Sequence, residues 1–294
     1  MKWQESKRPR RGRFAPSPTG PLHLGSLATA LASWLDARAE GYDWLVRIED
    51  LDPPREMAGA ADLILTQLLA HGLTWQTSPS PPARANGVLY QSDRHAAHRA
   101  ALHQLIDQGQ AFACRCSRKT LQQAVDNGLA RTNADGEFIY PGFCRHLRID
   151  PNQPGAALRF LSNAAGNNSG EDDFVIRRAD GFCAYHLAVV VDDAFQGITD
   201  IVRGDDLLSA APRHDLLRRA LGLLQPRLLH VPVMRNRDGE KLSKQTRSPA
   251  ARIDSAEVVA QQLQTAWAHL ETQMPMEWVS GARPWMVYLE KQQR

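Results

Sequence analysis

Apolar residues are spaced in two different ways over the first fifty positions of the chain. Leu27, Leu31 and Leu35 recur at the spacing that places them on one face of a helix. Gly41 fits the C-cap of this helix. The segment at 44–50 (WLVRIED) is typical of a strand, and residues 13–15 form a shorter strand candidate. Strand, turn, helix and strand in this order predict a βαβ unit, which requires a parallel sheet with a right-handed crossover.

Helical and strand patterns continue to alternate beyond this unit. Residues 62–70 and 94–108 have helical spacing, and Ser92 or Asp93 is the expected N-cap of the second helix. Residues 111–168 then differ in composition, because they contain clustered cysteines, several glycines and prolines, and a polar connector. We interpret this part as an insertion between two halves of the sheet.

The second half of the chain returns to strands and helices. The Asp180-Gly181 pair predicts a type I′ turn between two short strands. The segment ITDIVRGDDLL predicts a strand, a turn at Gly204 and a helix, and residues 228–234 predict a further buried strand. The chain from about Ser248 onward is expected to be helical.

These elements predict an α/β fold with a parallel core, one mixed insertion and a small helical C-terminal region. Five segments are expected: a basic N-terminal arm, the first half of the sheet domain, the insertion, the second half of the sheet domain, and a basic loop with C-terminal helices. Their boundaries are 1–12, 13–90, 91–175, 176–235 and 236–294.

Composition narrows the class of protein. The chain is 43% hydrophobic and 23% charged, as in soluble globular proteins. Because it has neither an apolar run of membrane-spanning length nor the apolar core of a signal peptide, we expect it to be cytoplasmic. A net charge of +3, from 35 basic and 32 acidic residues, is only a weak argument for a nucleic-acid partner.

The basic residues at the N-terminus are more concentrated. Residues 1–13 contain six lysines and arginines and one glutamate. Such a run is most often a solvated arm, and a contact to polyphosphate or RNA is the alternative.

The proline-rich segment APSPTGPLHLGS (residues 15–26) is the first candidate for chemistry. A helix that begins near Ser26 presents free N–H groups and the positive end of its dipole to an anion. Gly25 has no Cβ and lets a base or phosphate approach, while His23 can donate to a phosphate oxygen. An ordinary polar turn before a helix is the alternative for this segment taken alone.

Several motifs together resemble one family. RFAPSPTGPLHLGS resembles the first signature of class I aminoacyl-tRNA synthetases of the glutamyl branch, in which a His-x-Gly-His element holds ATP. KLSKQ (residues 241–245) resembles the second signature, a Lys-Met-Ser-Lys-Ser loop. RIED, AYHLAVVVDD and IVRGDDLL are similar to further glutamyl-synthetase segments in the same order. The resemblance extends over residues 13–245 and implies the Rossmann-like catalytic domain of this class.

The chain departs from the family pattern at three points. Ser26 stands where the class usually has its second histidine, and Gln245 where it usually has the last serine. Only about fifty residues follow Gln245, too few for the family's anticodon-binding domain. The chain therefore resembles the truncated branch of the family, the glutamyl-queuosine tRNA(Asp) synthetases, which attach glutamate to the queuosine base of an anticodon.

The resemblance implies an ATP site with two lysines at its centre. Lys244 is expected to stabilise the transition-state charge on the phosphates, with Lys241 assisting and His23 binding phosphate. A solvated basic turn is the alternative for KLSK alone. Mg²⁺ is expected with the ATP. The ATP-binding residues implied are His23, Gly25, Ser26, Lys241, Ser243 and Lys244.

The resemblance also implies a glutamate pocket. Arg13 is expected to pair with the side-chain carboxylate, helped by Arg203, and Glu49 to bind the ammonium group. Arg13 could instead belong to the basic arm, and the acidic neighbours of Glu49, Asp50 and Asp52, could be turn residues. PSPTG is the glutamyl rather than the glutaminyl version of the first loop. The glutamate-binding residues implied are Arg13, Phe14, Ala15, Pro16, Ser17, Glu49, Tyr185 and Arg203.

The clustered cysteines suggest a structural zinc ion. Cys114, Cys116 and Cys144 supply three ligands, and the family places a tyrosine fourth, which matches Tyr140. His146 and water are rival fourth ligands, and three unpaired buried thiols are the alternative to any metal.

The resulting hypothesis is an ATP-dependent ligase that activates L-glutamate as glutamyl-adenylate and transfers it to queuosine in tRNA(Asp). We expect it to act as a monomer without a membrane partner. The competing hypotheses are a glutamyl-tRNA synthetase that charges a tRNA 3′ end without an anticodon domain, and a non-catalytic zinc- or RNA-binding module.

Overall fold

The computed structural model describes residues 9–79, 83–133, 136–162, 173–236, 239, 241–242 and 248–294. The chain forms two compact units. The first comprises residues 1–93, 195–208 and 226–294, and the second comprises residues 94–194 and 209–225. Residues 176–194, assigned above to the second half of the sheet domain, cluster with the second unit.

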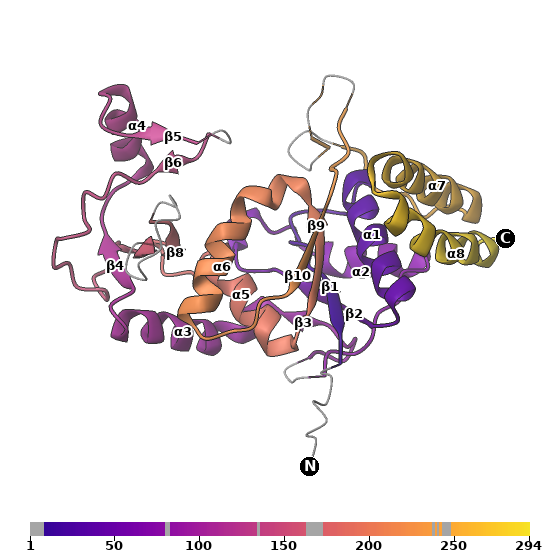
Figure 1. Cartoon of the computed structure of the whole chain (residues 1–294), viewed down its shortest axis with the longest axis horizontal. Coiled ribbons are helices and arrows are strands. Elements are labelled where there is room, and N and C mark those ends of the chain that lie inside the picture. The colour runs from indigo at the N-terminus through magenta and orange to yellow at the C-terminus, as the bar shows by residue number, and fades with distance from the viewer. Residues whose placement is uncertain are drawn as a thin grey trace, which may run out of the picture. The chain divides into compact units, whose positions relative to one another are not determined.

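Five strands of the first unit form one parallel sheet (Figure 1). They are β1 (Arg11–Phe14), β2 (Asp43–Ile48), β3 (Leu89–Tyr90), β9 (Asp200–Gly204) and β10 (Arg227–Val231). Their order is β10-β9-β1-β2-β3, and every neighbouring pair is parallel. In chain order, β2 and β3 therefore come first, on one side of β1, and β9 and β10 come later, on its other side. Ligands bind at the carboxyl ends of the strands where the order reverses in this way, which is at β1.

Helix α1 (Leu24–Glu40) is buried along most of its length against one face of this sheet. It ends where the sequence predicts, at Gly41, whose φ of 71° suits glycine at a helix C-terminus. Three further helices pack into the same core, α2 (Ala60–Ala70), α7 (Ala256–Gln273) and α8 (Met276–Gln292).

The second unit is mixed, as expected of the insertion. Its described residues form an antiparallel sheet, a two-stranded hairpin and the helices named below. Residues 195 and 196, at the end of one of these helices, cluster with the first unit. The strands are β4 (Ala111–Cys114), β5 (Arg131–Thr132), β6 (Phe138–Ile139), β7 (Ala157–Phe160) and β8 (Val175–Arg177). The helices are α3 (His95–Asp107), α4 (Arg118–Asp126), α5 (Tyr185–Gln196) and α6 (Ala211–Ala220).

Three local predictions differ from the structure. The N-cap of α3 is Arg94 rather than Ser92 or Asp93, because both of these residues lie inside a short 3₁₀ helix (Gln91–Arg94) that leads directly into α3. After β9 the chain forms a short 3₁₀ helix (Asp205–Ala210) before α6 begins. The strand expected after the turn at Asp180-Gly181 is reduced to one bridge between Cys183 and Arg177.

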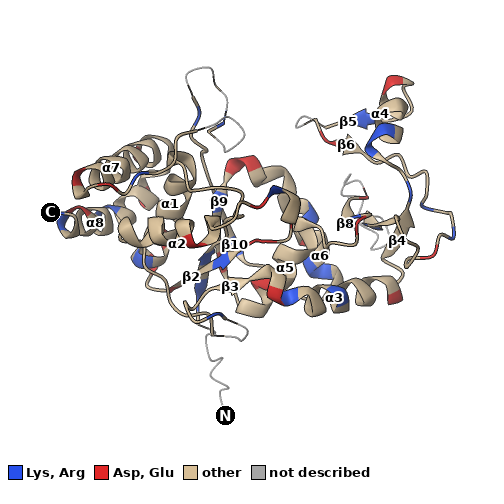
Figure 2. Cartoon of the chain, turned by 180° about the vertical axis from the view of Figure 1, so that it is seen from behind, with Lys and Arg blue, Asp and Glu red and all other residues tan. Residues whose placement is uncertain are grey.

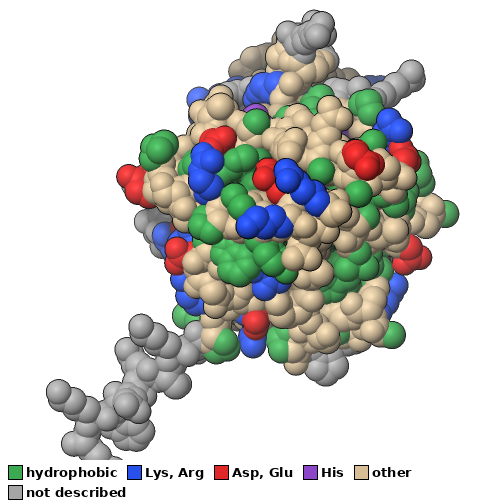
Figure 3. Space-filling view, turned by 90° about the vertical axis from the view of Figure 1, so that its right-hand side faces the viewer, with side chains coloured by type: hydrophobic (Ala, Val, Ile, Leu, Met, Phe, Trp, Pro, Cys, Tyr) green, Lys and Arg blue, Asp and Glu red, His purple; other side chains and the backbone are tan. Residues whose placement is uncertain are grey.

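No helix among the described residues is both long and apolar enough to cross a bilayer. Figure 3 views the end of the first unit where α7 and α8 lie, and it shows apolar side chains interspersed with charged groups of both signs. The surface of these helices is therefore mixed rather than uniformly apolar.

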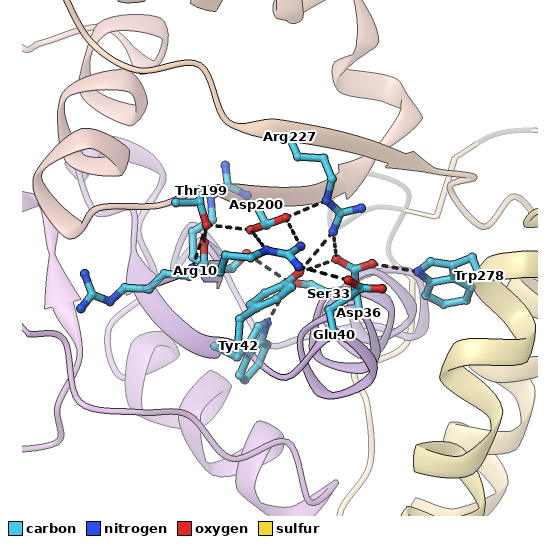
Figure 4. A network of polar contacts seen from close by, with 12 residues as sticks. Arg10, Ser33, Asp36, Glu40, Tyr42, Thr199, Asp200, Arg227 and Trp278 are labelled. Atoms are coloured by element: carbon cyan, nitrogen blue, oxygen red, sulfur yellow. Dashed lines mark hydrogen bonds and ion pairs between the residues drawn. The ribbon is translucent and has the colours of Figure 1, made fainter. Parts of the chain in front are cut away.

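A network of charges centred on two buried aspartates, Asp36 and Asp200, holds the amino edge of the parallel sheet (Figure 4). Asp200, the first residue of β9, accepts hydrogen bonds from Arg10 at 2.7 Å and from Arg227 at 2.6 Å. Arg227 also pairs with Asp36 of α1, which accepts from the Trp278 indole of α8 at 3.2 Å. The network therefore joins β9, β10, α1 and α8 at the edge opposite the carboxyl ends of the strands.

This arrangement controls the charge of Asp200. Burial alone would raise its pKa, but the hydrogen bonds from Arg10, Thr199 and Arg227 outweigh burial and lower the pKa to about 2. Since the ordinary value is near 3.8, the folded protein binds fewer protons than the unfolded chain in this range. The resulting stability is present above pH 4 and is lost as the pH falls toward 2.

We predict that Asp200→Asn lowers the free energy of unfolding by about 2 kcal/mol at pH 7, and that the difference from the wild type shrinks as the pH falls to about 3. Urea unfolding at the two pH values measures both effects. Glu40→Gln is the matched control, because Glu40 pairs with the same Arg10 but is exposed, and we expect it to cost about 0.5 kcal/mol or less. A loss of equal size at both pH values would contradict the assignment.

Candidate functional site

The HLGS turn forms a reciprocal cap at the start of α1. His23 has the extended backbone of an N-cap residue, and its Nδ1 accepts a hydrogen bond from the Ser26 N–H at 3.2 Å. In return the Ser26 hydroxyl accepts from the His23 N–H at 2.8 Å. The two side chains thus satisfy donors that a helix start otherwise leaves without partners, which is the capping-box arrangement.

This cap determines what His23 can offer to a ligand. Because Nδ1 accepts from a backbone N–H, the neutral ring carries its proton on Nε2. Nε2–H is therefore the ring group suited to donate to an anion at the N-terminus of α1. The Ser26 hydroxyl is occupied within the cap, which explains how serine fits a position where the class usually has histidine.

The loop that carries KLSK begins beside this turn. Its first part is pinned by the Leu242 N–H, which donates to the Met234 carbonyl at 2.8 Å. A Cβ added at Gly25 would lie only 3.3 Å from the Cβ of Leu242, so glycine permits the close approach of the two loops. Ala250, just after the loop, forms a β-bridge with His23. Ser243, Lys244 and Gln245 lie outside the described residues.

Two aspartates after β9 fix the base of the same loop. The carboxylate of Asp205 accepts from the Val233 N–H at 3.1 Å, and Asp206 forms an ion pair with Lys241. Gly204 accommodates this turn, because a Cβ there would collide with the Asp206 carboxylate. The GDD turn therefore holds Val233 and Lys241, which precede the undescribed residues 243–247, at the carboxyl edge of the sheet.

Three of the predicted glutamate-binding residues lie at the carboxyl ends of adjacent strands. Arg13 is in β1, Glu49 follows β2, and Arg203 is the penultimate residue of β9. All three side chains are buried. Two guanidinium groups and one carboxylate therefore lie at the same edge of the sheet, at the ends of neighbouring parallel strands.

Arg47 of β2 is a buried charge that the sequence analysis missed. It is fully buried and donates to the Glu49 carboxylate at 3.0 Å and to the Gln196 side chain at 3.0 Å. Glu49 is further positioned by its N–H, which donates to the Pro16 carbonyl at 3.0 Å. Glu49 is thus held in one place by the Arg47 guanidinium and by its own backbone.

The acidic neighbours of Glu49 have structural partners. Asp50 accepts from the N–H of Ser92 at 2.9 Å and from its hydroxyl at 2.6 Å. Asp52 pairs with Arg55 in the next turn. These contacts agree with the interpretation of Asp50 and Asp52 as turn residues.

Arg203 is held by a histidine on the next strand. Its Nε donates to Nε2 of His230 at 3.1 Å, and the two residues are paired in register between β9 and β10. Burial and the neighbouring guanidinium lower the pKa of His230, which keeps the ring neutral and able to accept this hydrogen bond. His230 therefore fixes the plane of the Arg203 guanidinium.

The other predicted pocket residues differ in placement. The ring of Phe14 stacks on Trp44 in the core with centroids 6.4 Å apart, so its backbone rather than its ring is available to a ligand. Ala15 and Pro16 are partly exposed and Ser17 is exposed after β1. Tyr185 begins α5 and belongs to the second unit, where its ring lies 5.5 Å from that of His186.

The three clustered cysteines converge with Tyr140 in the second unit. The Sγ atoms of Cys114, Cys116 and Cys144 lie within 4.8 Å of one another. The Tyr140 hydroxyl lies 3.4 Å from the Cys114 sulfur and 3.8 Å from the Cys116 sulfur. Burial raises the pKa of the Cys116 thiol to about 12. His146 is exposed and does not belong to the cluster.

The second unit carries basic residues on the elements next to the cysteines in the sequence. Figure 2 marks such residues on β5 and α4. Those exposed between residues 111 and 150 are Arg115, Arg118, Lys119, Arg131 and Arg148. This part of the second unit therefore presents positive charge suited to a phosphate backbone.

Comparison with known proteins identifies the family. A family profile described as "tRNA synthetases class I (E and Q), catalytic domain" matches residues 10–150 and 160–263. The chain is 49% identical over 274 residues to a glutamyl-Q tRNA(Asp) synthetase of Chromobacterium violaceum, covering 88% of this chain and 86% of that protein. It is 50% identical over 252 residues to that of Thiobacillus denitrificans, covering 81% and 79%.

Solved structures agree at the level of the fold. A glutamate tRNA ligase from Elizabethkingia meningosepticum, in complex with its amino acid, matches with a TM-score of 0.65 and 29% identity. The match covers 80% of this chain and 52% of the ligase, so the chain spans about half of its length. A methionyl-tRNA synthetase of Mycobacterium tuberculosis matches with a TM-score of 0.59 at 13% identity, covering 88% and 64%, and supports the fold alone. The predicted α/β fold is confirmed.

We predict that Arg47→Met lowers the free energy of unfolding by about 3–5 kcal/mol, because it leaves the buried Glu49 carboxylate without its partner. Adding Glu49→Gln should recover part of this loss, since the uncompensated charge is then removed. Urea unfolding of the single and double variants measures the coupling. Arg55→Met, which removes an exposed ion pair nearby, should change stability by about 0.5 kcal/mol or less. Strict additivity of the two substitutions would show that the pair is not coupled.

Proposed function

Since this chain belongs to the family of class I tRNA synthetases of the glutamyl and glutaminyl type, we propose that it activates L-glutamate with ATP and transfers it to the queuosine base of tRNA(Asp). The observation that carries this proposal is the set of buried charges at the carboxyl edge of the sheet. Arg13, Arg203 and Glu49 lie at adjacent strand ends there, the HLGS turn comes after β1 in the chain, and the GDD turn after β9 contacts Lys241. We expect the enzyme to work in the cytoplasm as a monomer.

The first step joins glutamate to AMP. An oxygen of the α-carboxylate bonds to the α-phosphorus of ATP, and the bond from that phosphorus to the β-phosphate bridging oxygen breaks, which releases pyrophosphate. Charge develops on the phosphates, so catalysis depends on positioned cations and N–H donors. Lys244 and Lys241 supply ammonium groups, and His23 donates through Nε2–H. Mg²⁺ bound with ATP would neutralise further phosphate charge.

Amino-acid selection uses the strand ends. Arg13 and Arg203 bind the side-chain carboxylate, and Glu49 binds the ammonium group. Guanidinium groups favour a carboxylate over the neutral amide of glutamine, because charge-assisted hydrogen bonds are about twice as strong as neutral ones. The fixed plane of Arg203 suits bidentate pairing.

The second step transfers the glutamyl group to a hydroxyl of the acceptor. That hydroxyl oxygen bonds to the activated carbonyl carbon, and AMP leaves with the electrons of the anhydride bond. Queuosine in tRNA(Asp) is the proposed acceptor, because relatives about half identical to this chain are named for it. The tRNA 3′ end is the second candidate, because the matching ligase structure is a glutamate tRNA ligase.

The proposal predicts where labelled glutamate appears. With ATP and total tRNA, we expect the label on the anticodon base of tRNA(Asp) from cells that make queuosine, and none on tRNA from cells that do not. Label at a 3′ end would favour the second candidate. Absence of glutamate-dependent pyrophosphate exchange would reject both and favour a binding module.

Arg203→Met provides the matching site test. It should lower kcat/KM for glutamate in pyrophosphate exchange by about 10–100-fold, since it removes hydrogen bonds to a charged group. Arg283→Met, at an exposed ion pair of α8, is the control and should leave the exchange unchanged. Equal effects of the two substitutions would contradict the role of Arg203.

We further propose that Cys114, Cys116, Cys144 and Tyr140 hold a structural zinc ion. Three sulfurs and a phenolic oxygen form a donor set that zinc accepts. The distance of 3.7 Å between the sulfurs of Cys116 and Cys144 suits a tetrahedron, whose edge is about 3.8 Å for Zn–S bonds of about 2.3 Å. The ion would join β4, the segment before α4, and the segment after β6.

The fourth ligand can be tested by metal content. We expect about one zinc per chain, lost to a chelator with a fall in melting temperature. Acid should also release it, because the ligands bind in deprotonated form. Tyr140→Phe should bind zinc more weakly in competition with a chelator, while His146→Ala should match the wild type. The reverse order of the two variants would assign His146 as ligand.

A further inference from the structure

Gln67 of α2 lies at the junction of the HLGS turn and the KLSK loop, although no motif includes it. Its side chain is 1% exposed. The side-chain oxygen accepts from the Leu22 N–H at 2.8 Å, and the side-chain nitrogen donates to the Ala251 carbonyl at 2.6 Å. One amide group thus uses both its acceptor and its donor on two distant segments of backbone.

The two segments are those that anchor the proposed ATP-binding loops. Leu22 directly precedes His23, the N-cap of α1. Ala251 follows Ala250, which bridges to His23 and ends the stretch that carries KLSK. The segments also contact each other, because the Ala251 N–H donates to the Leu22 carbonyl at 2.7 Å. Gln67 therefore completes a three-way backbone junction beneath both loops.

We propose that Gln67 is a positioning residue for ATP, which sets the HLGS turn and the returning end of the KLSK loop relative to each other. This inference rests on the proposed function, since it assigns Gln67 to the ATP site of the same reaction. Gln67 does not touch the ligand. It acts through Leu22 and Ala251 on the histidine and the lysines that meet the phosphates.

Glutamine is suited to this place for a chemical reason. Its amide is neutral, so it can be buried without an unpaired charge, and it offers an acceptor and a donor from one planar group. A methionine of similar length fills the space but leaves the Leu22 N–H and the Ala251 carbonyl without this partner. A glutamate keeps the acceptor and loses the donor until its carboxyl group is protonated.

The first test is Gln67→Met in glutamate-dependent pyrophosphate exchange. The concentration of active sites is measured by adenylate formation, and kcat/KM for ATP is expressed per active site. We expect this constant to fall about 10–100-fold, because small misplacements of reacting groups slow a reaction by factors of that order. KM for glutamate should change less than about 2-fold, since the residues proposed to bind glutamate lie elsewhere, at the ends of the strands. A purely structural role would lower the active fraction and leave both normalised constants unchanged.

Gln76→Met is the matched control. The Gln76 side chain also accepts from a backbone N–H, that of Trp44 at 2.6 Å, but at the opposite edge of the sheet. The Gln76→Met variant should be less stable than the wild type, but its kcat/KM for ATP should not fall selectively. Indistinguishable ATP kinetics of Gln67→Met and Gln76→Met would overturn the proposal.

Gln67→Glu gives a second and independent measurement. Its exchange rate relative to the wild type should rise as the pH falls, because protonation restores a donor toward the Ala251 carbonyl. If the ratio of the Gln67→Glu rate to the wild-type rate does not vary with pH, the proposed role of the hydrogen bond to the Ala251 carbonyl is wrong. If the wild type itself shows no glutamate-dependent exchange, the proposed function fails, whereas normal wild-type exchange with unaltered variants defeats only the role of Gln67.

Discussion

β1 pairs in parallel with β2 on one side and with β9 on the other, and the candidate site depends on that pairing. Parallel strands end at the same edge, so residues far apart in the sequence meet where their strands stop. Arg13, Glu49 and Arg203 are brought to adjacent strand ends in this way. A single antiparallel strand in the order would carry its terminal residue to the opposite edge, where the network around Asp200 stabilises the protein.

The elements nearest to this edge were the ones that the sequence predicted well. The helix over residues 24–40 and its end at Gly41 follow from apolar spacing and from glycine's tolerance of positive φ. The boundaries were less accurate where a short 3₁₀ helix leads into an α-helix. Ser92 has the chemistry of an N-cap, yet it lies inside the 3₁₀ helix before α3, where its N–H and hydroxyl donate to Asp50, and no local pattern could show that.

The residues that sequence reasoning missed share one property, since they act through partners distant in the chain. Arg47 did leave a signal, because a charge inside an apolar strand must find a buried partner, and that partner is Glu49. Gln67 left none, because a glutamine on a helix is ordinary until Leu22 and Ala251 are seen beside it. Motifs identify groups that touch a ligand more readily than groups that hold the backbone behind them.

The ion pair between Lys241 and Asp206 has a consequence for any anion that meets this lysine. Both side chains are partly exposed, so the pair contributes at most about 1 kcal/mol. An anion that bound Lys241 would compete with the Asp206 carboxylate and would gain only the difference between the two contacts. The aspartate therefore reduces the net affinity of Lys241 for anions in general, and it does so without a preference for one anion over another.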